Sequence, residues 1–400
     1  MNYFERAHEI NEETITNRRF FHKHAETGLS LPQTCEYLVN KLISYGITPS
    51  KCGNGITATI GKGRPVLLLR ADMDALPMQE LSGEPFASPS KKAAHTCGHD
   101  MHAAMLLSAA RMLKEQEKHL KGTVKLMFQP AEETLEGCKN MIASGILNNP
   151  PVDAALAFHV TSGHLPVGAY MYNHTHTMMT SSDNFQIEIK GKGSHGAYPN
   201  YSIDPINIGV HTHLALQELI SREVDCSHSC VLTIGQFIAG SAANIIPESA
   251  VMTGSIHTAN KETRKFLLDR IQSITKNTAD TYRGTSRLTF TSQVPPLICD
   301  SAFTQQIVHY IETLSLPSLQ PYPGIQANAS EDFAWIAETV PSCYLYLSAG
   351  FPDERGNYKA HHPKVRFNEE VLPFGAALYA FLSQKWLNEN NHLQNLRSHN

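Results

Sequence analysis

The sequence of 400 residues has no large excess of either charge, since 33 Lys and Arg oppose 37 Asp and Glu for a formal net charge of −4. It shows no basic stripe of the kind that binds nucleic acid. No stretch approaches the roughly twenty consecutive apolar residues of a membrane span, and the amino terminus lacks an apolar segment followed by a small-residue cleavage site. We therefore expect a cytoplasmic protein that binds neither nucleic acid nor membranes.

The sequence also lacks a disulfide framework. Its eight cysteines are scattered along the chain without the dense, regular spacing of small secreted domains, which favours reduced thiols. With 42% apolar and 18% charged residues the composition is that of an ordinary globular protein. Because 400 residues exceed the size at which a single hydrophobic core usually stops growing, we expect two domains.

Strand and helix patterns alternate over the first 182 residues. Apolar runs at residues 65–70, 123–129 and 153–158 predict buried strands, and an Ala-, Leu- and Met-rich stretch at 102–116 predicts a helix. This alternation implies a largely parallel sheet, which binds its ligands beyond the carboxyl ends of the strands. The polar residues expected at those ends are Asp72, Asp74, Glu132, Glu133 and His159.

The pattern changes near residue 183. Strands are predicted at 185–190, 231–238, 250–256 and 287–291, and helices at 204–222 and 261–282. This β-α-β-β-α-β order is that of the ferredoxin-like split motif. We therefore expect an α/β domain formed by residues 1–182 and 296–400, interrupted by an inserted α+β domain of residues 183–295.

The densest group of reactive side chains is the run His95-Thr96-Cys97-Gly98-His99-Asp100-Met101-His102 at the start of a predicted helix. Thiolate and imidazole are good ligands for transition metals. Gly98 would let the chain turn so that Cys97 and His99 face one ion. Taken alone, the run also fits a buried structural cysteine beside surface histidines.

Adjacent carboxylates follow the strand at 123–129. The side chains of Glu132 and Glu133 diverge, so that one can bind a metal while the other handles a proton. An isolated Glu-Glu pair also fits an acidic first helical turn. Similarly, His159 alone could be structural, and the pair His361-His362 could belong to a surface turn.

Taken together, these residues would project to one rim of one sheet, in numbers suited to two metal ions with open positions for water. The candidate ligands are Cys97, His99, Glu133, His159 and one of His361 or His362. A structural zinc site would close with four ligands and keep no further carboxylate nearby, so Glu132 favours catalysis.

The inserted domain contributes two weaker candidates for substrate contacts. His195 stands in the glycine-rich loop of residues 191–199, where flexible backbone would let an imidazole reach another site. Asn244 precedes Ile245-Ile246-Pro247 and could make a polar contact with a substrate. Each also fits an incidental polar loop residue.

These motifs resemble the amidohydrolase branch of the aminoacylase and carboxypeptidase G-type dinuclear metallohydrolases. That branch includes N-acyl-amino-acid amidohydrolases, hippurate hydrolases and indoleacetyl-amino-acid hydrolases. The ordered matches run from about Phe20 to Leu382 and comprise Arg70-Ala71-Asp72-Met73-Asp74-Ala75-Leu76-Pro77, Thr96-Cys97-Gly98-His99-Asp100-Met101-His102, Gln129-Pro130-Ala131-Glu132-Glu133, Phe158-His159, Gly193-Ser194-His195-Gly196, Ser330-Glu331-Asp332-Phe333 and His361-His362-Pro363.

The resemblance implies two divalent metal ions per subunit, zinc or manganese, with cobalt or nickel also acceptable to such ligands. The implied ligands are Cys97, His99, Glu133, His159 and His361. His361 is preferred to His362 because the family's ligand stands two residues before a proline. Glu132 is implied as general base and acid, and Asp74 as a supporting catalytic residue that orients a metal ligand.

The resemblance further implies that the inserted domain is a lid through which the protein forms a homodimer. His195 would then help polarise the substrate carbonyl, from its own subunit or its partner's. One departure concerns the substrate: relatives carry an arginine after the penultimate strand of the lid, whereas this chain has His257. A histidine binds a carboxylate only when protonated or through a neutral hydrogen bond, so recognition of a free α-carboxylate can differ here.

The expected reaction is metal-dependent hydrolysis of the amide bond of a small-molecule N-acyl amino acid, with an N-acetyl, N-benzoyl or similar acyl group. A small-peptide metallopeptidase or an N-acetyldiaminopimelate deacetylase would use the same machinery. Two further alternatives are a thiol hydrolase and a metal-binding protein without activity. In the thiol hydrolase, Cys97 would be the nucleophile and His99 or His102 its base, although a separation of two residues is poor geometry for such a pair. A metal-binding protein without activity would lack one of the candidate ligands or Glu132, and this sequence has all of them.

Overall fold

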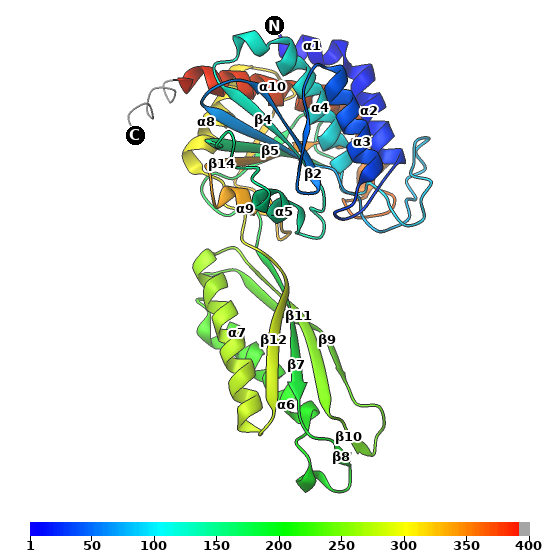
Figure 1. Cartoon of the computed structure of the whole chain (residues 1–400), viewed down its shortest axis with the longest axis vertical. Coiled ribbons are helices and arrows are strands. Elements are labelled where there is room, and N and C mark those ends of the chain that lie inside the picture. The colour runs from blue at the N-terminus through cyan, green and yellow to red at the C-terminus, as the bar shows by residue number, and fades with distance from the viewer. Residues whose placement is uncertain (392–400) are drawn as a thin grey trace. The chain divides into compact units, whose positions relative to one another are not determined.

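The structure is a computed structural model that describes residues 1–391, so residues 392–400 of the expected segment 296–400 lie outside the described part. The chain divides into two compact units (Figure 1). The large unit comprises Met1–Met178, Ile298–Gln326 and the chain from Trp335 onward. The small unit comprises Met179–Leu297 and Ala327–Ala334.

The large unit is built on one eight-stranded sheet with the order β1-β2-β4-β3-β5-β14-β6-β13. Its strands are β1 (Ser50–Cys52), β2 (Gly55–Gly61), β3 (Val66–Asp72), β4 (Thr123–Gln129), β5 (Ala154–Thr161), β6 (Tyr170–Tyr172), β13 (Pro321–Pro323) and β14 (Ser342–Ser348). The central strands β4, β3, β5 and β14 run parallel, whereas β2 and β6 pair antiparallel with their central neighbours. The predicted largely parallel α/β sheet is confirmed.

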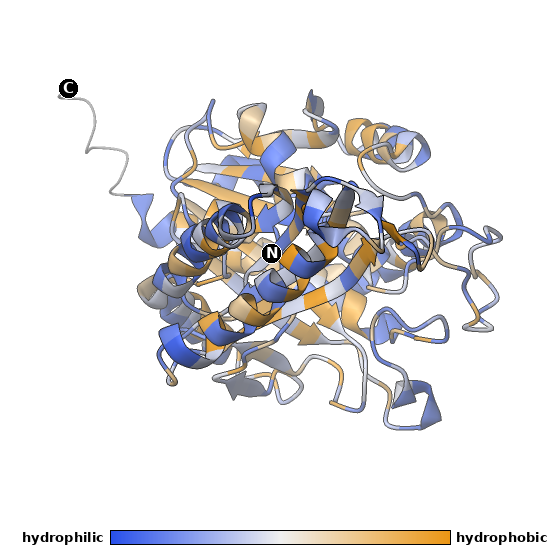
Figure 2. Ribbon diagram, turned by 90° about the horizontal axis from the view of Figure 1, so that it is seen from below, coloured by the Kyte–Doolittle hydropathy of each residue, from blue (hydrophilic) through white to orange (hydrophobic). Residues whose placement is uncertain are grey.

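Helices accompany this sheet. They are α1 (Tyr3–Glu9), α2 (Asn11–Lys23), α3 (Pro32–Ser44), α4 (His99–Glu115), α5 (Gly137–Ala143), α8 (Ser301–Thr313), α9 (Ala334–Ala337) and α10 (Leu372–Glu389), with short 3-10 turns at Glu117–His119, Glu354–Asn357 and Glu369–Val371. Of these helices, α1, α2, α3, α4, α8 and α10 share the hydrophobic core of the sheet. Strands β3 and β4 are buried along their whole length, as expected for parallel strands covered on both faces. Figure 2 shows apolar strands beneath helices that carry both polar and apolar turns.

The sequence also predicts a helix over residues 5–24 and one that follows Glu133 and runs through Leu147, and both differ in the structure. The helical stretch at the amino terminus is divided into α1 and α2 at Ile10, whose ψ of 7° is not helical and whose side chain is buried in the core. The helix expected directly after Glu133 begins only at Gly137, because Ala131 and Leu135 have positive φ values of 54° and 60° and turn the chain. Glu132 and Glu133 therefore lie in a turn and not in a helix.

The small unit has a four-stranded antiparallel sheet with the order β12-β7-β11-β9. Its elements are β7 (Ser182–Lys190), β8 (Ser194–His195), a 3-10 turn (Pro199–Tyr201), α6 (Pro205–Glu218), a π-helical turn (Leu219–Glu223), β9 (Cys230–Ala239), β10 (Ile245–Ile246), β11 (Ser249–Thr258), α7 (Lys261–Thr281) and β12 (Thr285–Val294). Apolar side chains of the sheet and of both helices form a separate core. The predicted ferredoxin-like order is confirmed.

The segment Ala327–Ala334 was not anticipated in the small unit. It joins this unit because Met179 forms a parallel bridge with Ala327, and the Thr180 N–H donates to the Ala329 carbonyl at 3.0 Å. The inserted part of the chain therefore runs from Met179 to Leu297, with one later segment added to it.

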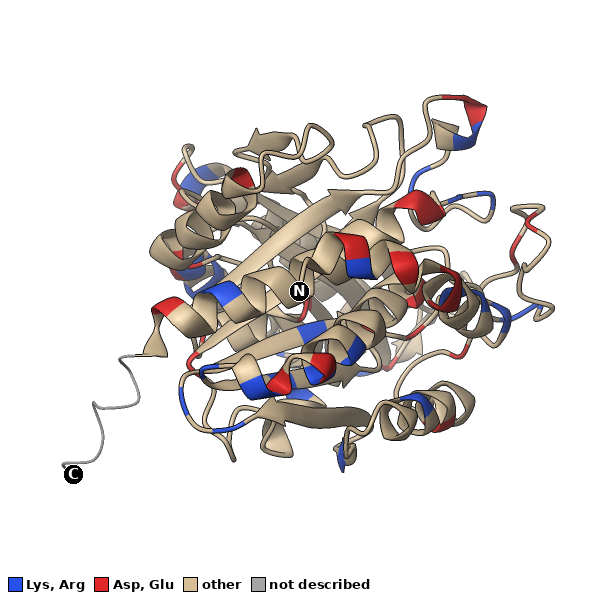
Figure 3. Cartoon of the chain, turned by 90° about the horizontal axis from the view of Figure 1, so that it is seen from above, with Lys and Arg blue, Asp and Glu red and all other residues tan. Residues whose placement is uncertain are grey.

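Positively and negatively charged residues are intermixed along the described helices of the large unit. Figure 3 shows that Lys and Arg positions, in blue, alternate with Asp and Glu positions, in red, along the helices of the large unit. None of the described helices is both long and apolar enough to span a bilayer.

Candidate metal centre

Cys97 and His99 are placed by the turn that begins α4. Gly98, between them, has a φ of 97°, which residues with a Cβ rarely adopt. A Cβ at Gly98 would also lie only 2.4 Å from Cγ2 of Val160 on β5. Glycine is therefore required here for two reasons, and it lets the residues on either side of it approach the end of β5.

Five candidate ligands converge at the carboxyl edge of the sheet. Cys97 Sγ lies 3.5 Å from His159 Nε2 and 3.3 Å from His361 Nε2. Glu133 Oε1 lies 3.4 Å from His361 Nε2 and 3.9 Å from His99 Nε2. Two overlapping sets of three donor atoms, Cys97 with His99 and His159 and Cys97 with Glu133 and His361, are each compact enough for one ion.

The imidazole rings are oriented by their second nitrogen atoms. His99 Nδ1–H donates to the Asp74 carbonyl at 2.9 Å, and His159 Nδ1–H donates to the Val160 carbonyl at 2.7 Å. Because a carbonyl can only accept, both rings turn Nε2 toward the cluster. His99 Nε2 is buried and makes no hydrogen bond. A buried nitrogen without a partner, next to a thiol and carboxylates, fits a metal ligand.

The electrostatics of the cluster also favour a bound cation. Burial raises the pKa of the Cys97 thiol to about 12 and holds the pKa of His159 well below its usual value. Burial disfavours the charged form of His99 as well, but the Asp72 carboxylate beside it raises the His99 pKa well above its usual value. A divalent cation would stabilise the thiolate and take the place of the proton on His99.

Asp74 holds the turn that carries both glutamates. Its carboxylate accepts from the backbone N–H of Glu132 at 2.9 Å and from that of Glu133 at 3.2 Å. Its carbonyl accepts from His99, so one residue fixes both the α4 side and the β4 side of the cluster. Asp74 acts on the site through other residues, and we describe it as a positioning residue.

The two histidines before Pro363 have different surroundings. His361 has a φ of 67°, its N–H donates to the Thr96 carbonyl at 2.8 Å, and its ring reaches Cys97 and Glu133. His362 instead stacks on Tyr358 with ring centroids 4.3 Å apart. Of the pair, the structure places His361 in the cluster.

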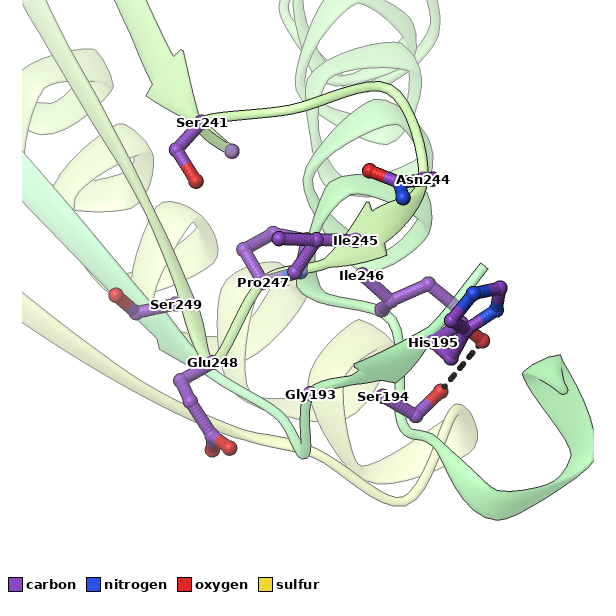
Figure 4. A pocket seen from close by; sticks show the side chains of 11 residues that line it. Gly193, Ser194, His195, Ser241, Asn244, Ile245, Ile246, Pro247, Glu248 and Ser249 are labelled. Carbon is purple, nitrogen blue, oxygen red and sulfur yellow. Dashed lines mark hydrogen bonds between the residues drawn. The ribbon is translucent and has the colours of Figure 1, made fainter. Parts of the chain in front are cut away.

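His195 and Asn244 belong to the small unit, where they share one hollow of about 680 Å³ (Figure 4). Strand β8, which ends at His195, pairs with β10 so that His195 stands opposite Ile245, and the Gly196 N–H donates to the Asn244 carbonyl at 2.8 Å. The His195 ring is exposed, and its Nδ1 accepts from the Ala197 N–H at 3.1 Å.

Two residues beside the cluster received no role in the sequence analysis. Asp72 forms a buried ion pair with Arg70 at 2.7 Å and lies 3.7 Å from His99 Nε2. His102 Nδ1 contacts the Asp72 carboxylate, and His102 Nε2 accepts from the Val160 N–H at 2.8 Å. Both nitrogens of His102 are therefore occupied, which excludes it as a ligand although it ends the same sequence run.

A largely parallel α/β sheet with buried thiol, imidazole and carboxylate groups at its carboxyl edge is the arrangement expected of a metal-dependent hydrolase. Within that class, the chain belongs to peptidase family M20/M25/M40, which matches residues 68–385. The protein is accordingly an enzyme, a hydrolase of an amidohydrolase and metallopeptidase family.

Relatives are similar over nearly the whole chain. The N-acetyl-L-cysteine deacetylase of Bacillus subtilis (strain 168) is 33% identical over 386 residues, which are 96% of this chain and 90% of that protein. The IAA-amino acid hydrolase ILR1-like 2 of Arabidopsis thaliana is 34% identical over 397 residues, 96% of this chain and 88% of that protein. The crystal structure of the Bacillus subtilis YXEP protein, a dinuclear metal binding peptidase of the M20 family, superposes with a TM-score of 0.79 at 29% identity and covers 95% of this chain and 99% of that one.

Proposed function

We propose that the protein hydrolyses the amide bond of N-acyl amino acids with an N-acetyl, N-benzoyl or similar acyl group and releases the free amino acid and a carboxylic acid. The observation that carries this proposal is the buried Nε2 of His99, which makes no hydrogen bond and lies 3.9 Å from a carboxylate oxygen of Glu132 and of Glu133. The names of two relatives, a deacetylase of N-acetylcysteine and a hydrolase of IAA-amino acids, support the substrate class.

Two divalent ions, zinc or manganese with cobalt or nickel as substitutes, would be held by Cys97, His99, Glu133, His159 and His361. Bound there, they would lower the pKa of a water molecule and polarise the scissile carbonyl. The thiolate and imidazole ligands favour zinc or its neighbours, and the carboxylate also admits manganese. Cys97 belongs to both compact sets of donor atoms, so its thiolate would be available to either ion.

Glu132 would accept the proton of the attacking water and return it to the leaving amine. Its backbone is fixed by Asp74, and its side chain is almost completely buried beside the candidate ligands. A carboxylate in such a position can serve as base and then as acid within one turnover. Glu133, one residue later, would act as a ligand because its Oε1 lies 3.4 Å from Nε2 of His361, another candidate ligand.

The small unit would supply contacts to the substrate. His195, on a loop with glycines at positions 193 and 196, would donate to the carbonyl oxygen of the scissile amide, from its own subunit or from a partner's. Asn244 would contact a polar group of the substrate. Their position on one hollow supports a shared role in substrate binding.

We further propose a homodimer that forms through the small unit. Apolar side chains are exposed on the outer face of α6 and on the edge strand β9, namely Ile206, Val210, Leu214, Val231, Phe237 and Ile238. A groove of about 260 Å³ runs between the two elements. Adjacent exposed apolar groups of this kind mark interfaces. We place the enzyme in the cytoplasm, where reducing conditions would keep Cys97 available as a thiolate ligand.

The proposed reaction is tested by amine release from N-acetyl, N-benzoyl and longer-chain N-acyl amino acids, with dipeptides in the same panel. Chelated enzyme is supplied separately with manganese, zinc, cobalt or nickel. We expect cleavage of at least one acyl class, restored by metal. Cleavage of dipeptides alone would support the small-peptide metallopeptidase, and no cleavage under any metal would overturn the proposal.

The thiol-hydrolase alternative gives the opposite response to chelation. An enzyme that used Cys97 as nucleophile would stay active without metal and lose activity on alkylation. The buried thiol and its raised pKa disfavour that chemistry. We expect full inactivation by chelation and recovery with metal.

A further inference from the structure

The parallel pairing of β3 with β5 stops before either strand ends. Their register runs from Leu67 opposite Ala154 to Arg70 opposite Ala157. Beyond that point β3 stays paired only with β4, as far as Asp72, and β5 only with β14, as far as Thr161. The sheet therefore opens between its two central strands, at the edge where the candidate ligands gather.

A tyrosine hydroxyl occupies the first open position. In a continued parallel ladder the Phe158 N–H would donate directly to the Arg70 carbonyl. Instead it donates to the Tyr379 hydroxyl at 3.0 Å, and that hydroxyl donates to the Arg70 carbonyl at 2.8 Å. One oxygen atom thus bridges the two backbone groups at the point where the register of β3 and β5 ends.

A histidine occupies the next position. In a continued ladder the Val160 N–H would bond to the Asp72 carbonyl, since bonds of a parallel pair recur every second residue. Instead it donates to His102 Nε2, and His102 Nδ1 contacts the Asp72 carboxylate. An imidazole ring is wider than a hydroxyl, so the gap between the strands increases toward the site.

Both inserted side chains come from tightly packed helices. His102 lies on α4 and Tyr379 on α10, and both are fully buried. The helices approach closely at Gly375, where a Cβ would lie 2.0 Å from Sδ of Met105. The Tyr379 ring also packs edge-on against Phe158 with centroids 4.5 Å apart. The width of the opening is therefore fixed by the core and not by a flexible loop.

We propose that Tyr379 and His102 are positioning residues that hold β3 and β5 apart and thereby set the distance between the two halves of the metal centre. One half consists of His99, Glu132 and Glu133, which are held by Asp74 just after the end of β3. The other half is His159, which lies on β5 between the two residues whose N–H groups are held by Tyr379 and His102. This inference rests on the proposed metal centre.

The test is Tyr379→Phe, which keeps the ring and removes the inserted oxygen. We expect metal affinity, measured by competition with a chelator, to fall about 10- to 100-fold, as for other residues that orient ligands. The visible absorption spectrum of the cobalt-loaded protein should also change, because it reports ligand geometry. A variant with wild-type affinity and spectrum would overturn the inference.

The matched control is Tyr310→Phe, which removes another buried tyrosine hydroxyl. Tyr310 lies on α8 and donates to Glu389 at the end of α10, away from the opening. We expect it to lose thermal stability while its metal affinity and cobalt spectrum stay as in the wild type. Equal losses of metal affinity in both variants would indicate a general structural effect and contradict the positioning role.

If Tyr379→Phe does not fold, His102→Asn decides the question. Asparagine keeps an N–H for Asp72 but provides no acceptor at the position of Nε2, so the Val160 N–H loses its partner. A wild-type metal affinity in this variant would overturn the inference. Failure of the wild-type protein itself to bind metal would instead contradict the proposed metal centre, so the two results are distinguishable.

Discussion

Adjacent glutamates take different surroundings in this protein because the turn that carries them is held from outside. Asp74 accepts from both backbone N–H groups, and Ala131 before them has a left-handed φ of 54°. Both carboxylates lie 3.9 Å from His99 Nε2, and that of Glu133 also lies 3.4 Å from His361 Nε2. Two chemically identical groups can therefore serve as ligand and as base.

For Glu132→Gln we expect kcat to fall about 10²- to 10⁴-fold, because the amide cannot accept a proton, with the metal content unchanged. Steady-state kinetics and elemental analysis measure the two quantities. Glu136→Gln is the control, since Glu136 stands on the same loop and its carboxylate accepts from Thr134 away from the cluster. Loss of metal from Glu132→Gln would show that Glu132 is a ligand instead.

For Gly98→Ala we expect the free energy of unfolding of the metal-free protein to fall by about 1–3 kcal/mol, together with weaker metal binding. The cause is the strained φ combined with the collision with Val160. Urea denaturation measures the change. Gly63→Ala shares a positive φ of 79° but meets no atom within 4 Å, so it isolates the strain from the collision. If both variants lost the same free energy of unfolding, the close approach of Gly98 to β5 would not contribute to stability.

The sequence places Glu133 and His159 at strand ends and Cys97 and His99 at the start of a helix, and the structure brings these side chains together. The reason is local: a buried strand that ends in polar residues presents them at the edge of the sheet. The roles of Asp72, His102 and Tyr379 were not predictable in this way. They depend on where β3 and β5 stop pairing, and nothing in the residues themselves shows that register.

At the scale of elements, the small unit contains an ion pair with a fully buried carboxylate. Asp183, at the start of β7, is fully buried and accepts from Arg264 of α7 at 2.8 and 2.7 Å, with Gln293 of β12 as a third donor at 3.1 Å. The pair joins one helix to the two adjacent strands of the sheet. A charge-assisted bidentate contact of this kind fixes the direction in which α7 crosses the sheet.

For Arg264→Met we expect the small unit to lose about 3–5 kcal/mol of stability, because the Asp183 carboxylate would stay buried without its main partner. Hydrogen exchange of the amides in β7 and β12 measures this loss within the unit. Arg222→Met, which removes one member of an exposed pair with Glu218, should change stability by less than about 0.5 kcal/mol. Unchanged exchange in Arg264→Met would mean that the ion pair does not hold α7 to the sheet.

The elements themselves were largely predictable where their periodicity was strong. Strands such as β3 and β4 are continuous apolar runs, and α6 and α7 keep an apolar stripe over several turns. The short strands β6 and β13 were not found, since three residues carry no periodicity. The break at Ile10 was missed because an apolar residue at a core-facing position looks the same whether the helix continues or ends there.

At the scale of the whole molecule, the proposed dimer depends on the apolar face of α6. The Leu214 side chain is 56% exposed in the single chain, and Leu214→Glu places a charge there. We expect the variant to sediment with the mass of one chain and the wild type with the mass of two chains. The physical reason is that burying an unpaired carboxylate in an apolar interface is unfavourable.

Leu81→Glu is the matched control for this prediction. Leu81 is similarly exposed, at 53%, but it belongs to the large unit and should leave the dimer intact. A wild-type protein that sediments as one chain would contradict the dimer, and dissociation of both variants would place the interface elsewhere.

The insertion of the small unit also determines the order in which the protein can be completed during synthesis. Strand β5 ends at Thr161, and its neighbour β14 begins only at Ser342, about 180 residues later. At roughly 5–20 residues per second, the ribosome needs about 10–40 s to make that interval. During this time the side of β5 that pairs with β14 stays unpaired, while the ribosome synthesises the small unit. His361 follows later still, so the nascent chain assembles its full set of candidate ligands only near the end of translation.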